Sequence, residues 1–331
     1  MSDGSLLEVN NLSVTYWGRM GLNLKRKSFQ AVKGVTFSIK PGQTLGVVGE
    51  SGSGKSSIAN AILGLVKSSG GSIRLGETEL TEMNMHYPST IRKQMQAVFQ
   101  DPFSSLNQSM TVEEIVGEPL RVHTEMSRAE RREKVIEILE TVSMSKEHIR
   151  RYPHEFSGGQ RQRIAIASAL ALEPRLVVLD EPVSALDVST QNKIINLLYK
   201  RRDALGIAYL LIAHDLALVH HISDRIAVMY LGRIVEEGPA DQVYSSPAHP
   251  YTRALLDAVP LLDPAKQRQR RAARKSATVV ELLTDDKPGC SYQNRCPEVM
   301  AVCRQKTPPV FPVDGGGVAS CYLYSDAEST S

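Results

Sequence analysis

The chain has 331 residues, of which 42% are hydrophobic and 23% are charged, and its formal net charge is +3. This is the composition of an ordinary globular protein of about two domains, and it excludes a disordered or fibrous chain. No apolar run approaches the roughly 18 residues of a membrane span, and the first residues lack the pattern of a signal peptide. The small net charge gives no support for a nucleic-acid partner. We therefore expect a cytosolic protein, in which cysteines stay reduced.

The first informative stretch is TLGVVGESGSGKSS, residues 44–57. Residues 44–48 are a short apolar run that predicts a buried parallel strand, and the residues after the stretch have helical spacing. Between strand and helix, residues 49–56 fit the phosphate-loop pattern G-x-x-x-x-G-K-[ST]. In such a loop, backbone N–H groups and a helix N-terminus face phosphate oxygens. Lys55 would reach the β- and γ-phosphates, and the Ser56 hydroxyl would bind Mg²⁺.

A charged helix is predicted from Ser127. Ser127 and Glu130 have the spacing of a capping box. Apolar residues follow at i, i+3, i+4 and i+7, which indicates one buried face. The arginines and glutamates around them are typical of a solvated face.

Two later apolar runs end in residues suited to phosphate chemistry. RLVVLDEP, residues 175–182, carries Asp180 and Glu181, and AYLLIAHD, residues 208–215, carries His214. Ligands bind at the carboxyl ends of parallel strands, so these side chains are expected beside the phosphate loop. Asp180 suits Mg²⁺, and Glu181 could polarise an attacking water. Taken alone, each feature would also fit an ordinary strand end.

With FSGGQRQR at residues 156–163, these motifs resemble the ATP-binding subunits of ATP-binding-cassette transporters. Ser157, Gly158, Gly159 and Gln160 look like the family signature, which other phosphate-loop ATPases lack. The order also agrees: AVFQDP precedes the signature, VVLDEP follows about 20 residues later, and SALD occupies residues 184–187. The resemblance covers residues 6 to about 255.

The resemblance implies an α/β fold: a RecA-like phosphate-loop NTPase core, an inserted helical subdomain and a small C-terminal cysteine-rich extension. Residues 1–255 would form the nucleotide-binding domain, with the helical subdomain at about 100–173. Residues 256–331 would form the extension with its four-cysteine site. A basic run at 266–276 is predicted to be a solvated linker or helix.

The resemblance also implies that two cassettes close head to tail. Each ATP would lie between the phosphate loop of one chain and the signature of the other. Glu181 would be the general base, His214 would hold the γ-phosphate, and Gln100 would sense Mg²⁺ and the attacking water. Lys55 completes the predicted catalytic set. The predicted Mg²⁺ ligands are Ser56, Gln100 and Asp180.

The predicted ATP contacts come from both chains of such a pair. Asp187 would couple the two sites, and in this family an aromatic from the N-terminal strands stacks on adenine. Tyr16 is our choice, with Trp17 and Phe29 as alternatives, because residues 18–30 look inserted. The residues predicted to contact ATP are Tyr16, Gly49, Ser51, Gly52, Gly54, Lys55, Ser56, Ser57, Ser157, Gly159, Gln160 and Asp187.

HPYTRALL, which begins at His249, and the cysteine-bearing tail resemble the oligopeptide and dipeptide importer branch. That branch implies two transmembrane permease subunits, a homologous second ATPase subunit in a heterodimer, and an extracytoplasmic peptide-binding protein. The chain would lie on the cytoplasmic side of the membrane. Phe103 and Leu106 could contact a permease or could close the subdomain's own core.

Other functions are alternatives. Nickel, glutathione and cationic peptides are the cargoes of some relatives in this branch. A soluble cassette ATPase that acts on nucleic acid is disfavoured, because such relatives usually have two cassettes or a long coiled coil. An exporter is disfavoured because its ATPase is often fused to membrane spans.

All four cysteines, at Cys290, Cys296, Cys303 and Cys321, lie within the last 42 residues. Scattered buried thiols, disulfides and a metal centre are the alternatives, and a reduced compartment disfavours disulfides. The C-x₂₋₄-C pairs typical of zinc are absent, and wider spacing suits a cluster bound from several loops. Some members of the branch carry a [4Fe–4S] cluster here, so we predict that cluster, with zinc as the alternative. It would staple a segment that has too little core to fold unaided.

Overall fold

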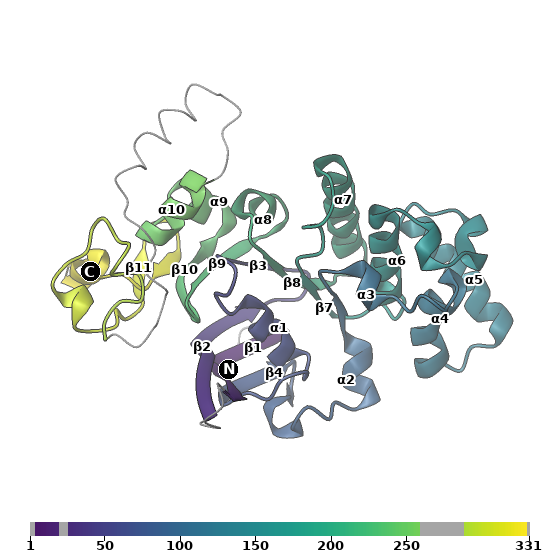
Figure 1. Cartoon of the computed structure of the whole chain (residues 1–331), viewed down its shortest axis with the longest axis horizontal. Helices are drawn as coiled ribbons and strands as arrows, with labels where there is room; N and C mark the ends of the chain where they lie inside the picture. Colours follow the sequence, from purple (N-terminus) through teal and green to yellow (C-terminus); the bar gives the residue numbers. More distant parts are fainter. Residues whose placement is uncertain (1–3, 20–25, 259–287, 330–331) are drawn as a thin grey trace.

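The computed structural model describes residues 4–19, 26–258 and 288–329 of the chain (Figure 1). The basic run predicted at 266–276 lies outside these residues. Within them, two sheets form the centre of an elongated molecule, with a group of helices at one end and the C-terminal segment at the other (Figure 1). None of the described helices combines the length and the apolarity that crossing a bilayer requires.

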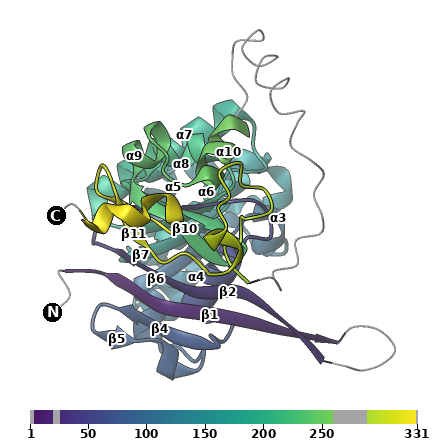
Figure 2. The ribbon, with the colours of Figure 1, turned by 90° about the vertical axis from the view of Figure 1, so that its left-hand side faces the viewer.

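A four-stranded antiparallel sheet has the order β2-β1-β4-β5. Its strands are β1 (Leu7–Arg19), β2 (Arg26–Ile39), β4 (Gly70–Leu75) and β5 (Thr78–Glu79). β1 and β2 pair from one end to the other and form a long hairpin that projects from the molecule (Figure 2). Val9 and Val14 of this sheet share a buried cluster with Ile58 and Ile62 of helix α1 (Lys55–Ile62). The sheet therefore supports the helix that follows the phosphate loop.

The second sheet has eight strands in the order β11-β12-β10-β9-β3-β8-β7-β6. They are β3 (Thr44–Val48), β6 (Met95–Val98), β7 (Leu176–Asp180), β8 (Ala208–Ala213), β9 (Arg225–Tyr230), β10 (Arg233–Pro239), β11 (Phe311–Val313) and β12 (Gly317–Ala319). Strands β6, β7, β8, β3 and β9 are parallel neighbours. Every residue of β3 and β8 is buried, because helices or the other sheet cover both faces, and their sequences are accordingly continuous apolar runs. The three predicted strands are confirmed as β3, β7 and β8.

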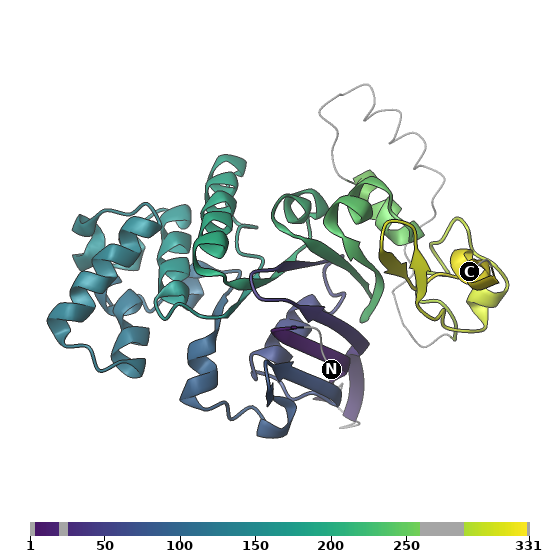
Figure 3. The same ribbon diagram turned by 180° about the vertical axis from the view of Figure 1, so that it is seen from behind.

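Helices occupy the chain between β6 and β7. They are α3 (Pro102–Ser105), α4 (Val112–His123), α5 (Arg128–Thr141) and α6 (Gly158–Leu170), and they lie together at one end of the molecule (Figure 3). Reciprocal capping boxes start α4, α5 and α6 at Thr111, Ser127 and Ser157. The helix predicted from Ser127 is confirmed, and Val135 and Leu139 are buried on its inner face. The other helices are α2 (Ser89–Gln94), α7 (Val188–Leu205), α8 (Leu216–Ile222), α9 (Ala240–Ser245) and α10 (Pro250–Ala258).

The described C-terminal extension, residues 288–329, continues the sheet of the core. Strand β12 pairs antiparallel with β10, through Glu236↔Ala319 and Glu237↔Val318, and β11 pairs with β12. Backbone hydrogen bonds that β10 would otherwise leave open are thereby satisfied. The extension is thus attached by main-chain pairing as well as by side chains.

The HPYT stretch, residues 249–252, forms the buried start of α10 and packs beside β10. The Glu236 carboxylate, which is 1% exposed, accepts hydrogen bonds from the backbone N–H groups of Ala248 and His249, both at 2.8 Å. The His249 imidazole is also 1% exposed, and its Nδ1 accepts the N–H of Tyr251 at 3.0 Å. Burial lowers the pKa of His249 to about 4. The neutral imidazole is therefore the form that this stretch requires.

We expect His249 to make the protein less stable as the pH falls. The pKa of His249 is lower in the folded chain than in the unfolded one, so the unfolded state binds the extra proton between about pH 6.5 and pH 4. Above about pH 6.5 this group leaves the free energy of unfolding unchanged, and below that pH the free energy of unfolding falls as the solution is acidified. Between pH 7.5 and pH 5 the loss is about 2 kcal/mol, measurable by urea denaturation followed by circular dichroism.

The control is His249→Asn, whose amide oxygen can accept the Tyr251 N–H without titrating. Burial raises the pKa of Glu236, which gives a pH dependence of opposite sign, but both proteins share it. The difference in stability between wild type and His249→Asn should therefore change by about 2 kcal/mol over this range. A difference that is constant with pH would show that His249 does not titrate in this way.

Candidate functional site

The predicted phosphate loop lies between the carboxyl end of β3 and the start of α1. Its shape depends on two glycines that leave no room for a side chain. A Cβ atom on Gly49 would lie 2.1 Å from the Met229 carbonyl oxygen, and one on Gly54 would lie 2.2 Å from the Ala31 carbonyl oxygen. Gly54 also has φ of 107°, which disfavours other residues. The backbones of β9 and β2 thus pack so closely against the loop that only glycine fits at these two positions.

Lys55 folds back over its own loop. Its Nζ donates to the carbonyl oxygens of Gly49 at 2.8 Å and Glu50 at 2.9 Å, and Lys55 is 5% exposed. Burial lowers the pKa of this ammonium group, and the nearby carboxylates of Glu181 and Asp180 act against that shift. The cation is therefore held at the loop by oxygen atoms, and phosphate oxygens are chemically equivalent acceptors for it.

Two predicted Mg²⁺ ligands lie together at the end of β7. The Ser56 hydroxyl donates to Asp180 Oδ1 at 3.2 Å. Burial raises the pKa of Asp180, and the hydrogen bond from Ser56 opposes this shift. A hydroxyl and a carboxylate are oxygen donors of the kind that Mg²⁺ prefers, so this pair fits the ion.

Two predicted catalytic residues, Gln100 and His214, contact the carboxylate of a third, Glu181. Gln100 Nε2 donates to Glu181 Oε2 at 2.9 Å, and His214 Nδ1 lies 3.4 Å from the same oxygen. Glu181 has φ of 46°, a left-handed conformation that non-glycine residues rarely adopt and that is common at functional sites. The three residues follow β6, β7 and β8, which are neighbours in the sheet. A cavity of about 50 Å³ lies beside Glu181 and His214.

Tyr16 is close to the phosphate loop, as its predicted role requires. Its hydroxyl donates to Ser57 Oγ at 3.2 Å. Trp17 and Phe29 on the same hairpin are more exposed, at 71% and 62% against 36% for Tyr16. The geometry favours Tyr16 over the other two aromatics, and its stacking on adenine stays a prediction.

The predicted signature forms the start of α6. Ser157 Oγ accepts the N–H of Gln160 at 3.4 Å, and Gln160 Oε1 accepts the N–H of Ser157 at 3.0 Å. A Cβ atom on Gly159 would lie 2.4 Å from Thr190 Cγ2, so α6 and α7 pack closely here. Asp187 caps α7 by accepting the Thr190 N–H at 3.0 Å. Among the hydrogen bonds and ion pairs of the described residues, none joins the signature to the phosphate loop of its own chain.

The four cysteines are free thiols that lie near one another. Cys303 and Cys321 are buried, and the Cys290 N–H donates to the Cys303 carbonyl oxygen at 2.7 Å. Burial raises the pKa of the Cys321 thiol to about 11, and the other three thiols contribute in the same direction. Nevertheless, no three His, Cys, Asp or Glu side chains in the described part of the chain are arranged to hold a metal ion. Thiols influence one another's pKa at distances well beyond a metal–sulfur bond, so the raised pKa of Cys321 does not indicate a metal centre, and the described arrangement of the cysteines gives the predicted centre no support.

Sequence reasoning missed Glu50 and its two side-chain partners at the phosphate loop. Glu50 lies within the loop, and its partners are Tyr251 and Arg295, more than 200 positions away. Tyr251 belongs to HPYT, which the sequence marks only by its resemblance to the importer branch. Nothing in the sequence signals the contact with Arg295.

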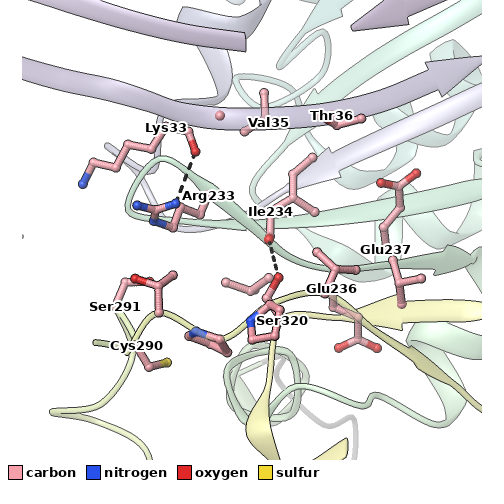
Figure 4. Close-up of a pocket in the computed structure, with 17 residues that line it drawn as sticks. Lys33, Val35, Thr36, Arg233, Ile234, Glu236, Glu237, Cys290, Ser291 and Ser320 are labelled. Carbon is pink, nitrogen blue, oxygen red and sulfur yellow. Dashed lines mark hydrogen bonds between the residues drawn. The ribbon is translucent and has the colours of Figure 1, made fainter. Parts of the chain in front are cut away.

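A second cavity, of about 340 Å³, lies where β2, β10 and the extension meet (Figure 4). Of the predicted site residues only Cys290 lines it. Arg233 donates to the Lys33 carbonyl oxygen at 3.5 Å, and Ser320 Oγ donates to the Ile234 carbonyl oxygen at 3.4 Å (Figure 4). This cavity belongs to the junction of extension and cassette, not to the nucleotide site.

Comparison with known proteins gives consistent results. The family model described as ABC transporter matches residues 32–184, and the one described as oligopeptide/dipeptide transporter, C-terminal region, matches residues 235–303. The chain is 47% identical over 317 residues to the oligopeptide transport ATP-binding protein OppF of Escherichia coli K12, covering 92% of each protein. It is 42% identical over 328 residues to AppF of Bacillus subtilis 168, an oligopeptide transport ATP-binding protein, covering 97% of this chain and 98% of that protein.

Solved structures agree. The dimeric post-hydrolysis structure of the ATP-binding cassette MJ0796 bound to ADP and phosphate has a TM-score of 0.63 and 31% identity, covering 71% of this chain and 98% of the other. The predicted α/β phosphate-loop NTPase fold is therefore confirmed. With 47% identity across nine-tenths of both chains, the protein belongs to the ATP-binding subunits of ABC transporters that carry the oligopeptide/dipeptide transporter C-terminal region.

Proposed function

We propose that this protein is the ATP-hydrolysing subunit that energises import of oligopeptides or dipeptides across the cytoplasmic membrane. The observation that carries the proposal is that Gln100 and His214 both contact Glu181 beside the phosphate loop. The relatives of this chain are named as oligopeptide transport ATP-binding proteins, which supports the transport role. Related cargoes are the alternative: nickel, glutathione or cationic peptides. A soluble cassette ATPase without a transport role is a more distant one.

In the proposed mechanism, Glu181 accepts the proton of the attacking water. Its Oε2 is held by Gln100 and faces His214, so the carboxylate is oriented before the reaction begins. Lys55 exchanges its loop carbonyl partners for β- and γ-phosphate oxygens, and His214 contacts the γ-phosphate. Ser56, Asp180 and Gln100 are the residues that would hold Mg²⁺. When bound, the ion neutralises developing charge on the phosphates.

A second, homologous ATPase subunit completes each site. Ser157, Gly159 and Gln160 would contact ATP held by the partner, and Asp187 would couple the two sites. The free N-terminus of a helix favours an anion, and Ser157 is the exposed residue at the start of α6. The similar MJ0796 cassette is described as dimeric. We propose a heterodimer, as in the importer branch.

We propose residues 1–255 as the nucleotide-binding domain, 100–173 as its helical subdomain and 256–331 as the extension. The helical subdomain would receive a permease. Phe103 is 53% exposed and is available for that contact, whereas Leu106 is 6% exposed and closes the subdomain's core. The assembly would contain two permeases and an extracytoplasmic peptide-binding protein, with this chain on the cytoplasmic side and no nucleic acid.

We also propose that the extension binds a [4Fe–4S] cluster through Cys290, Cys296, Cys303 and Cys321, with zinc as the alternative. Four free thiols in one small segment are a chemically suitable donor set. In the described geometry they do not converge on one ion, so binding would require the cysteine loops to close together.

Replacing Glu181 by Gln should stop hydrolysis without preventing nucleotide binding. The amide cannot accept the proton of the attacking water, and general-base catalysis contributes about 10²–10⁴-fold. We expect ATP turnover by the assembled transporter to fall at least 100-fold, with little change in ATP affinity. Glu137→Gln, on an exposed face of α5 with its side chain 64% exposed, is the matched control. Equal turnover by the two variants would exclude Glu181 as the base.

Cargo can be tested in proteoliposomes that contain the complete transporter and its binding protein. We expect ATP-dependent uptake of a labelled tri- or tetrapeptide, and uptake at background with the Glu181→Gln variant. Nickel and glutathione are tested in parallel. Uptake of one of these without uptake of peptide would contradict the proposed cargo, and ATP turnover without any uptake would favour a non-transport ATPase.

If the extension binds a cluster, anaerobically purified protein should contain about four iron and four sulfide per chain. Cys303→Ser should remove most of the iron, whereas Ser291→Ala, in the same segment, should retain it. Stoichiometric zinc without iron would establish the zinc alternative. Protein that binds neither metal on reconstitution would refute a metal centre.

A further inference from the structure

The segment between the first two cysteines reaches the phosphate loop. Within CSYQNRC, residues 290–296, Arg295 donates from Nη1 to Glu50 Oε2 and from Nη2 to Glu50 Oε1, both at 2.9 Å. The pair is bidentate and joins residues 245 positions apart. Neither side chain is fully buried, with 32% of Arg295 and 39% of Glu50 exposed. One carboxylate of the phosphate loop is therefore neutralised from the C-terminal extension.

The backbone of Glu50 is held as well. Its N–H donates to the Tyr251 hydroxyl at 2.9 Å, and Tyr251 is 0% exposed. The Tyr251 ring lies 4.5 Å from Tyr230 and 5.4 Å from Tyr292, measured between centroids. The Arg295 guanidinium carbon lies 5.7 Å from the Tyr292 ring centroid. Three tyrosines and one arginine, from the cassette and the extension, thus fix both the main chain and the side chain of Glu50.

The N–H of Glu50 and the carbonyl of Gly49 belong to one peptide plane, in which they point in opposite directions. Tyr251 holds the N–H side at 2.9 Å, and Lys55 Nζ contacts the carbonyl side at 2.8 Å. A rotation of this plane would move the oxygen away from the ammonium group. Tyr251 therefore fixes the orientation of one of the carbonyl groups that hold Lys55.

The charge of Glu50 gives Arg295 a second effect. A carboxylate in a loop that binds a triphosphate repels the ligand, and an opposite charge at hydrogen-bond distance reduces that repulsion. With the guanidinium in place, the side chain of Glu50 is directed toward the extension. Without it, the same negative charge would be free to approach the phosphates.

We infer that Tyr251 and Arg295 are positioning residues for Lys55 and the phosphate loop, and that the 290–296 segment thereby sets the affinity of this chain for nucleotide. The inference rests on the proposed ATPase function. It concerns residues of this chain alone.

The test measures binding of Mg·ADP and Mg·ATP to the full chain within its transporter, together with KM and kcat. Arg295→Gln should weaken nucleotide binding about tenfold and raise KM to match, with kcat within about twofold, because the chemistry at Glu181 is untouched. Arg304→Gln, an exposed arginine of the same extension, is the matched control. Equal affinities in the two variants would overturn the inference for Arg295.

A double variant separates positioning from folding. Glu50→Gln removes the charge that Arg295 neutralises, so Glu50→Gln/Arg295→Gln should bind nucleotide within about twofold of Glu50→Gln alone. A structural loss would instead make the double variant at least as weak as Arg295→Gln. Tyr251→Phe keeps the ring and removes only the hydroxyl, and should raise KM several-fold. Tyr324→Phe, which loses a hydroxyl bonded to the Ala248 carbonyl oxygen, should not.

These outcomes are independent of transport. If wild type binds no adenine nucleotide, the proposed function fails. If wild type binds nucleotide and Arg295→Gln binds it equally well, only the positioning role fails.

Discussion

The candidate site depends on one constraint, the parallel register of β3, β8 and β7. Val48 pairs with Ala213, and Asp180 with Ile212, so the carboxyl ends of all three strands lie at the same level. Residues that follow these strands must then meet at one edge of the sheet. The contacts of Ser56 with Asp180 and of Glu181 with His214 follow from this register. A slip of one residue in any pair would turn every side chain of the slipped strand to the opposite face and separate these residues.

The conformation of the phosphate loop depends on the neighbouring strands as well as on its own glycines. The carbonyl groups of Met229 and Ala31 exclude any side chain at Gly49 and Gly54. The cost of burying the Lys55 ammonium is offset by two loop carbonyls and by nearby carboxylates. Donors and charges are consequently in place before a nucleotide arrives, which is the arrangement expected of a site that stabilises charge rather than reorganising around it.

Sequence reasoning succeeded where a feature is local. Three kinds of feature lie where predicted: the loop, the two strand ends and the capped helix from Ser127. The residues that determine each of them lie within about 15 consecutive positions of the sequence. Sequence reasoning could not find the Arg295–Glu50 pair, because a contact across 245 residues depends on how the extension packs. The cysteine spacing likewise shows that four sulfur donors are present, but it does not determine whether they come close enough to bind one metal centre. Strand β12 is only three residues long, so no periodicity in its sequence could predict that it joins the sheet of the core.

The contacts of the HPYT stretch explain why it occurs together with the C-terminal extension. Its histidine is neutral and buried, and Glu236 accepts the N–H groups of His249 and of Ala248 before it. Its tyrosine accepts a hydrogen bond from the phosphate loop, and its ring lies against Tyr292 of the extension. Glu236 itself lies on β10, which pairs with β12 of the extension. Removing the extension would uncover this edge of β10 and leave Glu50 without its arginine. The cysteine-bearing segment is therefore in direct contact with the phosphate loop, through the pair of Arg295 and Glu50 and through the ring of Tyr292 against Tyr251.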